Sequence, residues 1–461
     1  MHTDNFYFNI SERRLYLRAL DIGFTVLGLY VLNVYFNFDY FDFSNPSCAL
    51  WISTLIIYLL VFGEIFEMYD LKVASDKYLT LRSATITVFF VTLFYVFTPV
   101  ISPILPTNRL QLVYFVLTLL LAIFLNRLFY ILLIFSPRFL KNILLIAEES
   151  QLEGLVAAIQ NKSANRIVAV VSNAVMASND KINFIAISDA NLEEIVKKEG
   201  INEIVISSNN FQFITPKLNN QLILLFEKGI AIRSADNFIE EETHRISETK
   251  LTTDFYNHFT FSKSHQNNLY LAFRRIVDII FSLIGIAFFF LLIPFVFVGN
   301  LFANKGKLLY TQKRIGKRGK KFRIIKFRTM VANAEENGAE WAQKNDSRVT
   351  AFGRILRKTR LDEIPQFINV LKDEMSLIGP RPERPEFVKL LENEIPFYAI
   401  RHVVKPGLTG WAQVMYPYAH TVDDQHKKLM YDLYYIKERN LLMDFKIIIK
   451  TISTILFFRG T

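Results

Sequence analysis

Two adjacent acidic residues, Asp362 and Glu363, have the type and the placement to do chemistry on a phosphate group. Pro365 follows them, and because a helix tolerates proline in its first turn, the sequence predicts a helix that begins near Asp362. Both carboxylates would then lie at the positive end of the helix dipole, which stabilises their ionised forms and attracts phosphate. A pair that only caps the helix is the alternative, and it accounts for one acid rather than two.

Basic residues surround this pair in four short blocks. The blocks supply Lys326 and Arg328, then Arg354, Arg357, Lys358 and Arg360, then Arg381, and finally Arg401 and Lys405. Arginine is suited to paired hydrogen bonds with phosphate and lysine to point-charge contacts. Two carboxylates among such cations can also hold Mg²⁺, which prefers oxygen ligands and substrate phosphates, so Asp362 and Glu363 are candidate metal ligands. The histidines of this region lack the spacing of zinc ligands.

An apolar stretch over residues 276–302 precedes these blocks and is long enough to cross a bilayer. Basic clusters stand on both sides of it, so a full crossing would place one of them outside the cell. We therefore expect a re-entrant membrane helix over residues 273–302, broken midway and leaving on the side it entered, with a spanning helix as the alternative. Asp278 and Ser282 share a face that can support the break, and Pro294 removes a hydrogen bond further along.

The composition of the 461-residue chain points to further membrane segments, because 51% of the residues are hydrophobic and 43 are Phe. Four apolar stretches of suitable length lie in the first 140 residues, at Leu17–Phe36, Leu50–Tyr69, Ala84–Ile101 and Leu110–Phe135. We expect residues 1–141 to form a bundle of four transmembrane helices, the first of them retained rather than cleaved, with both ends cytoplasmic. Helices of a buried soluble core are the alternative.

The net charge of +10 could indicate nucleic acid, anionic lipid or phosphorylated substrates. The basic residues cluster next to apolar segments, which favours the membrane surface and phosphates. Cys48 is the one cysteine, so no intrachain disulfide forms, as expected of large domains that face a reducing cytosol. Arg127, inside the fourth stretch near its cytoplasmic end, could extend toward the membrane surface, and we assign it no function.

Short apolar runs alternate with helix-like runs over residues 142–262. The apolar runs lie at Ile143–Ala147, Ile167–Val171, Ile182–Ile187, Glu203–Ser207 and Ile230–Arg233, and the helix-like runs at Gln151–Gln160, Asn191–Glu199 and Lys217–Lys228. This alternation predicts a Rossmann-like α/β domain with a parallel sheet. The glycine-rich turn that binds dinucleotides is missing after the first run, so we expect a degenerate domain with a spacer, oligomerisation or regulatory role.

The stretch from Phe273 to Thr461 resembles the bacterial sugar transferases, the polyprenyl-phosphate hexose-1-phosphate transferases. The matching segments are RRIVDIIFS, QKRIGKRGKKFRIIKFRTM, NDSRVTAFGRILRKTRLDEIPQFINVLKDEMSLIGPRPE, RHVVKPGLTGWAQV and YDLYYIKERNLLMDFKIIIKT. The resemblance implies a mixed α/β catalytic domain over residues 303–461. With the bundle and the middle domain, the whole chain is similar to the large, multi-pass members of the family.

The resemblance also implies an activity. A hexose-1-phosphate, with glucose as the expected hexose, would pass from a UDP-sugar to undecaprenyl phosphate with release of UMP, as the first membrane step of exopolysaccharide, capsule or O-antigen synthesis. Asp362 would be the nucleophile that forms a phosphosugar-aspartyl intermediate, and Glu363 would assist with Mg²⁺ and the acceptor phosphate. The candidate substrate-binding residues are Lys326, Arg328, Arg357, Arg381 and Arg401. We expect a homodimer in the bacterial inner membrane, with the catalytic domain in the cytoplasm and no nucleic-acid partner.

Two positions depart from the family pattern. The family usually has a small residue at the position of Arg360 and a Gly-Pro pair at Gly306 and Lys307, and neither change removes a catalytic group. A direct, single-displacement transfer that uses the same residues is an alternative mechanism. A non-catalytic membrane scaffold of a polysaccharide export complex is the alternative function.

Overall fold

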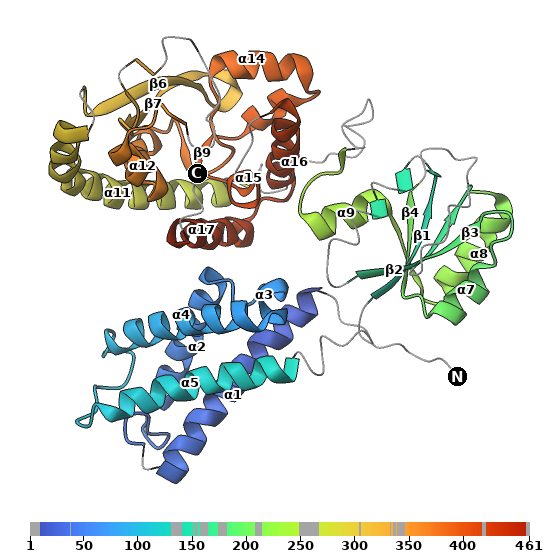
Figure 1. Cartoon of the computed structure of the whole chain (residues 1–461), viewed down its shortest axis with the longest axis horizontal. Helices are drawn as coiled ribbons and strands as arrows, with labels where there is room; N and C mark the ends of the chain where they lie inside the picture. Colours follow the sequence, from blue (N-terminus) through green and yellow to red (C-terminus); the bar gives the residue numbers. More distant parts are fainter. Residues whose placement is uncertain are drawn as a thin grey trace. The chain divides into compact units, whose positions relative to one another are not determined.

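The computed structural model describes residues 10–36, 38–130, 141–149, 151, 152, 155, 156, 165–173, 182–207, 214–248, 267–303, 306–331, 333, 334, 338, 346–416 and 421–457. The chain divides into two compact units, Met1–Phe238 and Ile239–Thr461. The first unit contains a helical bundle followed by an α/β domain, and the second contains the acidic pair. Figure 1 labels the helices and strands of both units.

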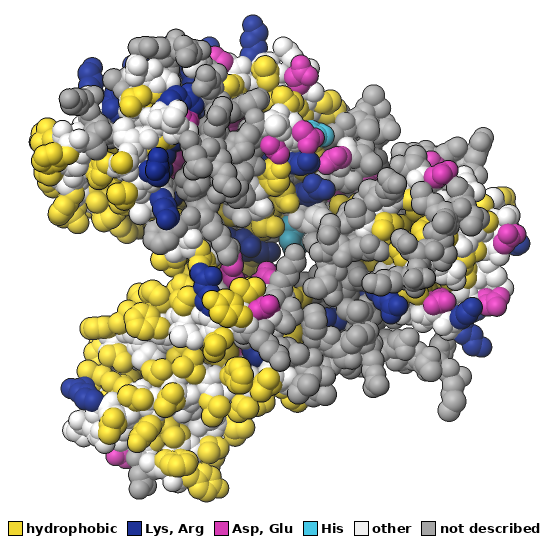
Figure 2. All heavy atoms as spheres, in the orientation of Figure 1, with side chains coloured by type: hydrophobic (Ala, Val, Ile, Leu, Met, Phe, Trp, Pro, Cys, Tyr) yellow, Lys and Arg dark blue, Asp and Glu magenta, His cyan; other side chains and the backbone are white. Residues whose placement is uncertain are grey.

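Four long helices and one short helix make up the bundle. They are α1 Ile10–Phe36, α2 Cys48–Ile65, α3 Leu71–Ser75, α4 Lys77–Val96 and α5 Leu110–Phe129. Four of the five described helices that are long and apolar enough to cross a membrane lie here, which supports a multi-pass membrane protein. Figure 2 shows hydrophobic side chains over the outside of the bundle. The third long helix begins before the predicted Ala84 because Asp76 caps it, accepting a hydrogen bond of 2.8 Å from the Leu79 N–H.

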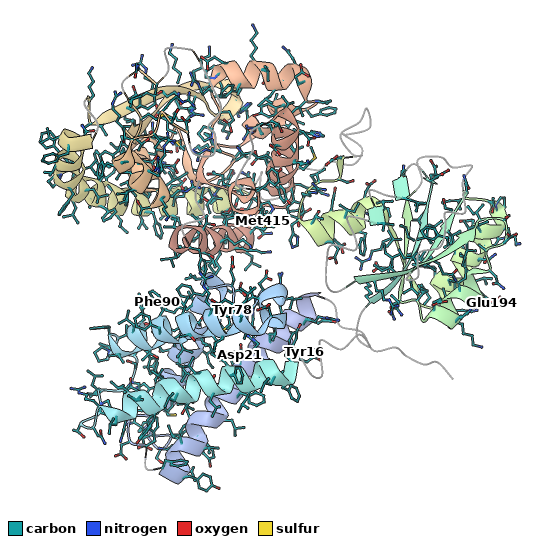
Figure 3. The ribbon with its side chains drawn as sticks, in the orientation of Figure 1. Tyr16, Asp21, Tyr78, Phe90, Glu194 and Met415 are labelled. Atoms are coloured by element: carbon teal, nitrogen blue, oxygen red, sulfur yellow. The ribbon has the colours of Figure 1, made fainter. Side chains whose placement is uncertain are left out.

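A buried charged pair joins α1 to α5 inside the bundle. Asp21, labelled in Figure 3, accepts hydrogen bonds from Arg127 at both carboxylate oxygens, with Nη2–Oδ2 at 2.9 Å and Nη1–Oδ1 at 3.3 Å. Asn126 Nδ2 donates a third bond of 2.6 Å to Oδ1. Arg127 therefore turns into the bundle and does not extend toward the membrane surface, because Asp21 offsets the cost of burying its charge.

The α/β domain has a five-stranded parallel sheet in the order β3-β2-β1-β4-β5, so the predicted parallel sheet is confirmed. Its elements are β1 Lys141–Ala147, β2 Asn165–Ser172, β3 Asn183–Ala186, α7 Leu192–Glu199, β4 Glu203–Ser207, α8 Pro216–Glu227 and β5 Ala231–Ser234. Apolar side chains such as Leu144, Ile146 and Ile204 form its core. The helix predicted over residues 151–160 lies largely outside the described residues.

The second unit combines one long apolar helix with two small sheets and short helices, as expected of a mixed α/β domain. Its strands are β6 Leu309–Ile315 and β7 Lys321–Phe327, which pair antiparallel, and β8 Ser376–Ile378 and β9 Gly407–Thr409, which pair parallel. Its helices are α11 Asn268–Ala303, η5 Lys317–Gly319, α12 Ala351–Lys358, η6 Leu361–Gln366, α13 Phe367–Leu371, α14 Pro385–Glu394, η7 Tyr398–Val403, α15 Trp411–Met415, α16 Val422–Glu438 and α17 Leu441–Leu456. One further helix, α9 Ala235–Thr243, contains the boundary between the two units.

The second unit begins earlier in the chain than the sequence predicts. Residues 239–248 belong to it, whereas we expected the α/β domain to continue to residue 262. Ile246 is buried in the core of the second unit beside Leu429 and Met430. The strand-and-helix pattern ends at β5, and a single apolar residue such as Ile246 gives no sign of the unit in which it packs. Residues 249–262 lie outside the described part of the chain.

The long helix α11 runs without interruption from Asn268 to Ala303, so the predicted break midway is wrong. Pro294 lies inside the helix, where it removes one backbone hydrogen bond, and the helix bends instead of ending. Figure 1 shows the ribbon of α11 changing direction toward its C-terminal end. Both parts of the helix pack on the second unit, with Gly285 against the ring of Phe367 and Gly299 against the ring of Phe352.

Asp278 and Ser282 do not support a break in α11. Asp278 instead anchors the helix to β8, accepting hydrogen bonds of 2.9 Å from the Leu377 N–H and 3.1 Å from Ser376 Oγ. Ser282 is fully buried, and its hydroxyl has no hydrogen-bond partner among the described residues. The i, i+4 spacing correctly placed the two residues on one face, but that face is packed against the protein.

Candidate active site

The acidic pair lies in η6, a 3₁₀ helix that begins at Leu361 and continues into α13. The predicted helix start is therefore confirmed, although the first turn is 3₁₀ rather than α. Arg360 precedes it in the left-handed conformation with φ of 58°, a conformation that favours small residues such as glycine. This turn directs both carboxylates into the interior of the second unit, where Asp362 and Glu363 are each 7% exposed.

One asparagine in α13 holds this segment against β7. Asn369 accepts a hydrogen bond of 3.1 Å from the Ile325 N–H and donates one of 2.8 Å to the Arg323 carbonyl. These two bonds bring Lys326 on β7 next to the acidic pair. No local sequence motif predicts this role of Asn369, because its hydrogen-bond partners lie more than forty positions away along the chain.

Four apolar residues at helical spacing form a half-buried stripe along this helix. They are Ile364, Phe367, Ile368 and Leu371. The stripe faces α11, with Phe367 against Gly285, whereas the fully buried residues Asn369 and Val370 lie on another face. The helical spacing thus places the four residues on one face, and α11 covers that face in part.

Glu363 is held by three cations. Its Oε1 lies 2.8 Å from Lys326 Nζ and 3.0 Å from Arg381 Nη2, and its Oε2 lies 3.3 Å from Arg360 Nη1. Burial alone would raise the pKa of Glu363, but the charges of Lys326, Arg381 and Arg360 outweigh it and hold the pKa well below its usual range. Glu363 is therefore ionised and fixed in place.

Asp362 differs from its neighbour, since within the described residues its carboxylate accepts no hydrogen bond and pairs with no cation at contact distance. Burial, followed by the charge of Glu363, raises the pKa of Asp362 to about 6. Lys326, Arg357 and Arg381 act in the opposite direction. A carboxylate that titrates near neutral pH and has no protein partner is available for a substrate.

Arg357 lies on α12 and reaches toward Asp362. Its Nε donates a hydrogen bond of 2.9 Å to Thr329 Oγ1, which fixes the guanidinium near the acid that it helps to keep ionised. Gly353 permits this, because a Cβ on it would lie 2.0 Å from the Thr329 carbonyl oxygen. The structure thus brings together Asp362, Glu363, Lys326, Arg357 and Arg381. With Arg360, four cations oppose two acids, so two positive charges remain for a phosphorylated substrate.

Arg381 is positioned by a residue that the sequence did not indicate as part of the site. Gln413 on α15 accepts a hydrogen bond of 3.2 Å from Arg381 Nη1, while Nη2 contacts Glu363. Gln413 is buried, and its Nε2 has no partner among the described residues. Its segment GWAQV was part of the family resemblance, and that was the one available signal for Gln413.

The other two candidate phosphate-binding residues make different contacts. Arg401 is buried behind the site, where its guanidinium pairs with Asp432 at 2.8 Å, donates to the Arg381 carbonyl at 3.0 Å and contacts the Tyr398 hydroxyl. These contacts place Arg401 as a support for Arg381. Arg328 Nε donates a hydrogen bond of 2.9 Å to the Lys307 carbonyl. This bond holds the Arg328 side chain against the loop before β6.

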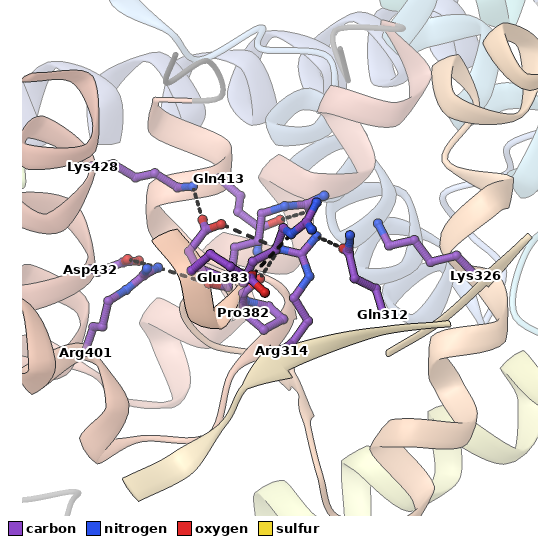
Figure 4. Close-up of polar contacts among 12 residues, drawn as sticks. Gln312, Arg314, Lys326, Pro382, Glu383, Arg401, Gln413, Lys428 and Asp432 are labelled. Carbon is purple, nitrogen blue, oxygen red and sulfur yellow. Dashed lines mark hydrogen bonds and ion pairs between the residues drawn. The ribbon is translucent and has the colours of Figure 1, made fainter. Parts of the chain in front are cut away.

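A buried charge cluster lies beside Arg401, as Figure 4 shows. Glu383 contacts Lys428 at 3.0 Å and Arg314 at 3.6 Å, and Arg314 also donates to the Pro382 carbonyl at 3.0 Å. Burial would raise the pKa of Glu383, but Lys428, Arg401 and Arg314 lower it to about 2. Glu383 lies two residues after Arg381. The cluster therefore fixes the backbone beside Arg381, the residue that contacts Glu363.

The fit of the acidic pair to Mg²⁺ follows from these contacts. Among the described residues, no group of three or more His, Cys, Asp or Glu side chains is placed to hold a metal ion. Glu363 is committed to three cations, whereas Asp362 has free oxygens. The residues therefore fit an ion that Asp362 holds together with oxygens of a bound substrate, as Mg²⁺ does in phosphate sites.

Comparison with known proteins agrees with this geometry. Residues 269–458 match the bacterial sugar transferase family. A UDP-N-acetylgalactosamine-undecaprenyl-phosphate N-acetylgalactosaminephosphotransferase from Aeromonas hydrophila is 47% identical over 188 residues, which cover 41% of this chain and 44% of that protein. Two UDP-glucose:undecaprenyl-phosphate glucose-1-phosphate transferases, from Klebsiella pneumoniae and Caulobacter vibrioides, are each 36% identical to this chain over the matched residues. The one from Klebsiella pneumoniae matches over 40% of either chain, and the one from Caulobacter vibrioides over 40% of this chain and 69% of its own.

This chain therefore belongs to the bacterial sugar transferase family, and the predicted resemblance is confirmed. It spans less than half the length of the relatives from Aeromonas and Klebsiella, and the family match lies within the second unit. The bundle and the α/β domain lie outside the family match.

Proposed function

We propose that this protein transfers a sugar-1-phosphate from a UDP-sugar to undecaprenyl phosphate and releases UMP. The names of its relatives support the substrates, and the contrast between the two acids supports the chemistry. Glu363 is paired with Lys326, Arg381 and Arg360, whereas Asp362 is free and titrates near pH 6. A site with one fixed and one free carboxylate among cations suits nucleophilic attack on phosphorus.

In the proposed first step, a carboxylate oxygen of Asp362 forms a bond to the β-phosphorus of the UDP-sugar. The bond from that phosphorus to the oxygen bridging the two phosphates breaks, and UMP leaves with the bridging oxygen. In the second step, an oxygen of undecaprenyl phosphate attacks the same phosphorus, and the bond to Asp362 breaks. Neither step requires a proton, and Lys326, Arg357 and Arg381 stabilise the charge on the transferring group.

The division of labour between the acids follows from their contacts. Glu363 keeps Lys326 and Arg381 in place and adds negative charge beside Asp362, which raises the pKa of Asp362 and makes it a stronger base once ionised. A Mg²⁺ ion bound by Asp362 and the substrate phosphates would neutralise charge on the UMP leaving group. Loss of activity in EDTA that Mg²⁺ restores is the expected result, and full activity in EDTA would contradict it.

The membrane arrangement is also a proposal. Helix α11 packs along its length against the rest of the second unit. Hydrophobic side chains such as Phe281, Phe295 and Leu301 are exposed on the same helix. A re-entrant helix that is bent at Pro294 rather than broken, and that stays on the cytoplasmic face of the bacterial inner membrane, accounts for both observations. Cysteines introduced at the two ends of α11 in a chain with Cys48→Ser would both be labelled from the cytoplasm. Labelling of one end from the opposite side would indicate a spanning helix.

The homodimer stays a prediction, which a measurement of the size of the purified protein in detergent would test.

The sugar is open between two groups of relatives. Glucose is the prediction from the sequence, while the Aeromonas relative with 47% identity is named for N-acetylgalactosamine and the Klebsiella relative with 36% for glucose. UMP release by the purified protein with undecaprenyl phosphate and a panel of UDP-sugars decides between them. Absence of UMP with every sugar would contradict the enzymatic proposal and favour a membrane scaffold.

Trapping of the intermediate tests the mechanism. Protein incubated with a UDP-sugar that carries ³²P at the β-phosphate, without acceptor, should retain label after denaturation. Asp362→Asn should retain none and lose at least about 10⁴-fold in turnover, as expected for a missing nucleophile. Glu363→Gln is the matched control and should keep detectable labelling. If the transfer is a direct single displacement, the wild-type protein should retain no label that is lost in Asp362→Asn.

A further inference from the structure

A short segment before the family match packs into the second unit. Residues 240–247, called the docking segment here, precede residues 269–458, where the match to the bacterial sugar transferases lies. Ile246 is 1% exposed and lies in one apolar core with Leu429, Met430 and Leu433. Its N–H donates a hydrogen bond of 3.2 Å to the Met430 carbonyl. The docking segment is thus an integral part of the unit that carries the acidic pair.

Two more contacts fix the segment. Glu240 is 5% exposed and pairs with Lys437 at 2.8 Å. His244 adopts the left-handed conformation with φ of 53°, and its carbonyl accepts a hydrogen bond of 2.9 Å from Trp411 Nε1. His244 Nδ1 lies 3.3 Å from the Tyr434 hydroxyl, and its ring lies edge-on to Trp411. A non-glycine residue holds this backbone conformation where surrounding contacts determine it.

The contact with Trp411 leads to the acidic pair in three steps. Trp411 is 2% exposed and begins α15, the five-residue helix that also carries Gln413. Gln413 accepts the hydrogen bond from Arg381 Nη1, and Arg381 Nη2 contacts Glu363 at 3.0 Å. Each step is a direct hydrogen bond or a connection within one short helix, so a shift of the docking segment would move Arg381 relative to Glu363.

We propose that the docking segment positions Arg381 through Trp411 and Gln413, and that activity therefore depends on residues outside the family domain. Because the segment follows directly on the α/β domain, whose last strand ends at Ser234, it also gives that domain a route to affect the site. This inference rests on the proposed function for its assay. If the segment served only to fill the apolar core, its loss would lower stability without changing the site.

The test compares Ile246→Ala with two controls in the full-length protein. Ile223→Ala changes the same residue type at an exposed position on α8, and Ile246→Val keeps most of the buried side chain. Ile246→Ala should lower kcat/KM for the UDP-sugar at least about tenfold, because small misplacements of a binding group are costly, while both controls retain activity. The acidic limb of its pH profile should move upward, because a displaced Arg381 lowers the pKa of Asp362 less. An unchanged kcat/KM and pH profile would overturn the proposal.

Combination with Gln413→Ala separates positioning from a general loss of packing. If the segment acts through Gln413, the double variant should be no less active than Gln413→Ala alone. Additive losses would contradict the route through α15. Trp411 fluorescence in a Trp51→Phe/Trp341→Phe background, which removes the other two of the three tryptophans, should shift to longer wavelength in Ile246→Ala. No shift would show that the segment does not cover Trp411, against the proposal.

UDP binding keeps this inference distinguishable from the proposed function. Calorimetry with UDP should show affinity for Ile246→Ala at least about tenfold weaker than wild type, whether or not turnover occurs. Absence of turnover by wild type that still binds UDP would count against the proposed activity alone. Equal UDP affinity of Ile246→Ala and wild type would count against positioning by the docking segment.

Discussion

The ammonium group of Lys326 lies 2.8 Å from Oε1 of Glu363. After burial and the charge of Glu363, which raise the pKa of Asp362, Lys326 is the strongest influence that lowers it. Lys326 therefore contacts the fixed acid and also acts on the free one, and its charge lowers the pH at which Asp362 ionises.

The pH profile tests this relationship. In the proposed reaction Asp362 attacks only as a carboxylate, so the rate of UMP release should fall as the pH drops below about 6. Lys326→Met removes a cation that lowers the pKa of Asp362, so the acidic limb should move upward by about one pH unit. Lys321→Met, at the exposed far end of the same strand, is the control and should leave the limb in place. An acidic limb that moves downward in Lys326→Met would be incompatible with this role.

The anchor between α11 and β8 gives a second prediction. Asp278→Ala removes the acceptor for Leu377 N–H and Ser376 Oγ, which costs about 1–3 kcal/mol for a buried donor left unpaired. Because β8 leads directly into Arg381, kcat/KM for UMP release should also fall. Ser282→Ala, four residues along the same helix, removes a buried hydroxyl that has no partner among the described residues and should change the melting temperature little. Equal effects of the two variants would contradict the anchoring role.

The sequence allowed prediction of the features that depend on local pattern. The acidic pair at a helix start follows from Asp362, Glu363 and Pro365 alone, and the parallel sheet follows from alternating apolar runs. Both rest on periodicity and capping, which act over a few residues. The long apolar length of α11 was equally evident, but the response of the helix to Pro294 depends on neighbouring contacts that no local pattern encodes.

The sequence did not allow prediction of which cations contact the acidic pair and which pair elsewhere. Arg401 and Arg381 carry the same charge, yet Arg381 contacts Glu363 while Arg401 pairs with Asp432, 31 positions later in the chain. Which arginine meets an acid of the site depends on long-range packing around Glu383. A block of basic residues therefore predicts a phosphate site better than it predicts the members that touch the phosphate.

The charge cluster around Glu383 supports a prediction about stability. Glu383→Gln removes the carboxylate that pairs with both of the buried cations Arg314 and Lys428, which should cost about 3–5 kcal/mol of unfolding free energy. Since the folded-state pKa of Glu383 is lowered to about 2, its stabilisation is complete above the unfolded value near 4.5 and is lost as the pH falls from 4.5 toward 2. Thermal unfolding of the purified protein across this range measures both effects. Glu386→Gln, an exposed acid in the same segment, is the control, and a wild-type stability that is flat below pH 4.5 would contradict the assignment.

The pair of Asp21 and Arg127 should hold the bundle together. Arg127→Met leaves Asp21 buried without its cation, which should cost about 3–5 kcal/mol and lower the melting temperature in detergent. Asp21→Leu combined with Arg127→Met should recover most of that loss, because two apolar side chains then replace the pair. Arg18→Met breaks the more exposed contact with Glu64 and should cost at most about 1 kcal/mol. If Arg127→Met unfolds no more readily than Arg18→Met, or if the double variant is the least stable of all, the buried pair does not have this role.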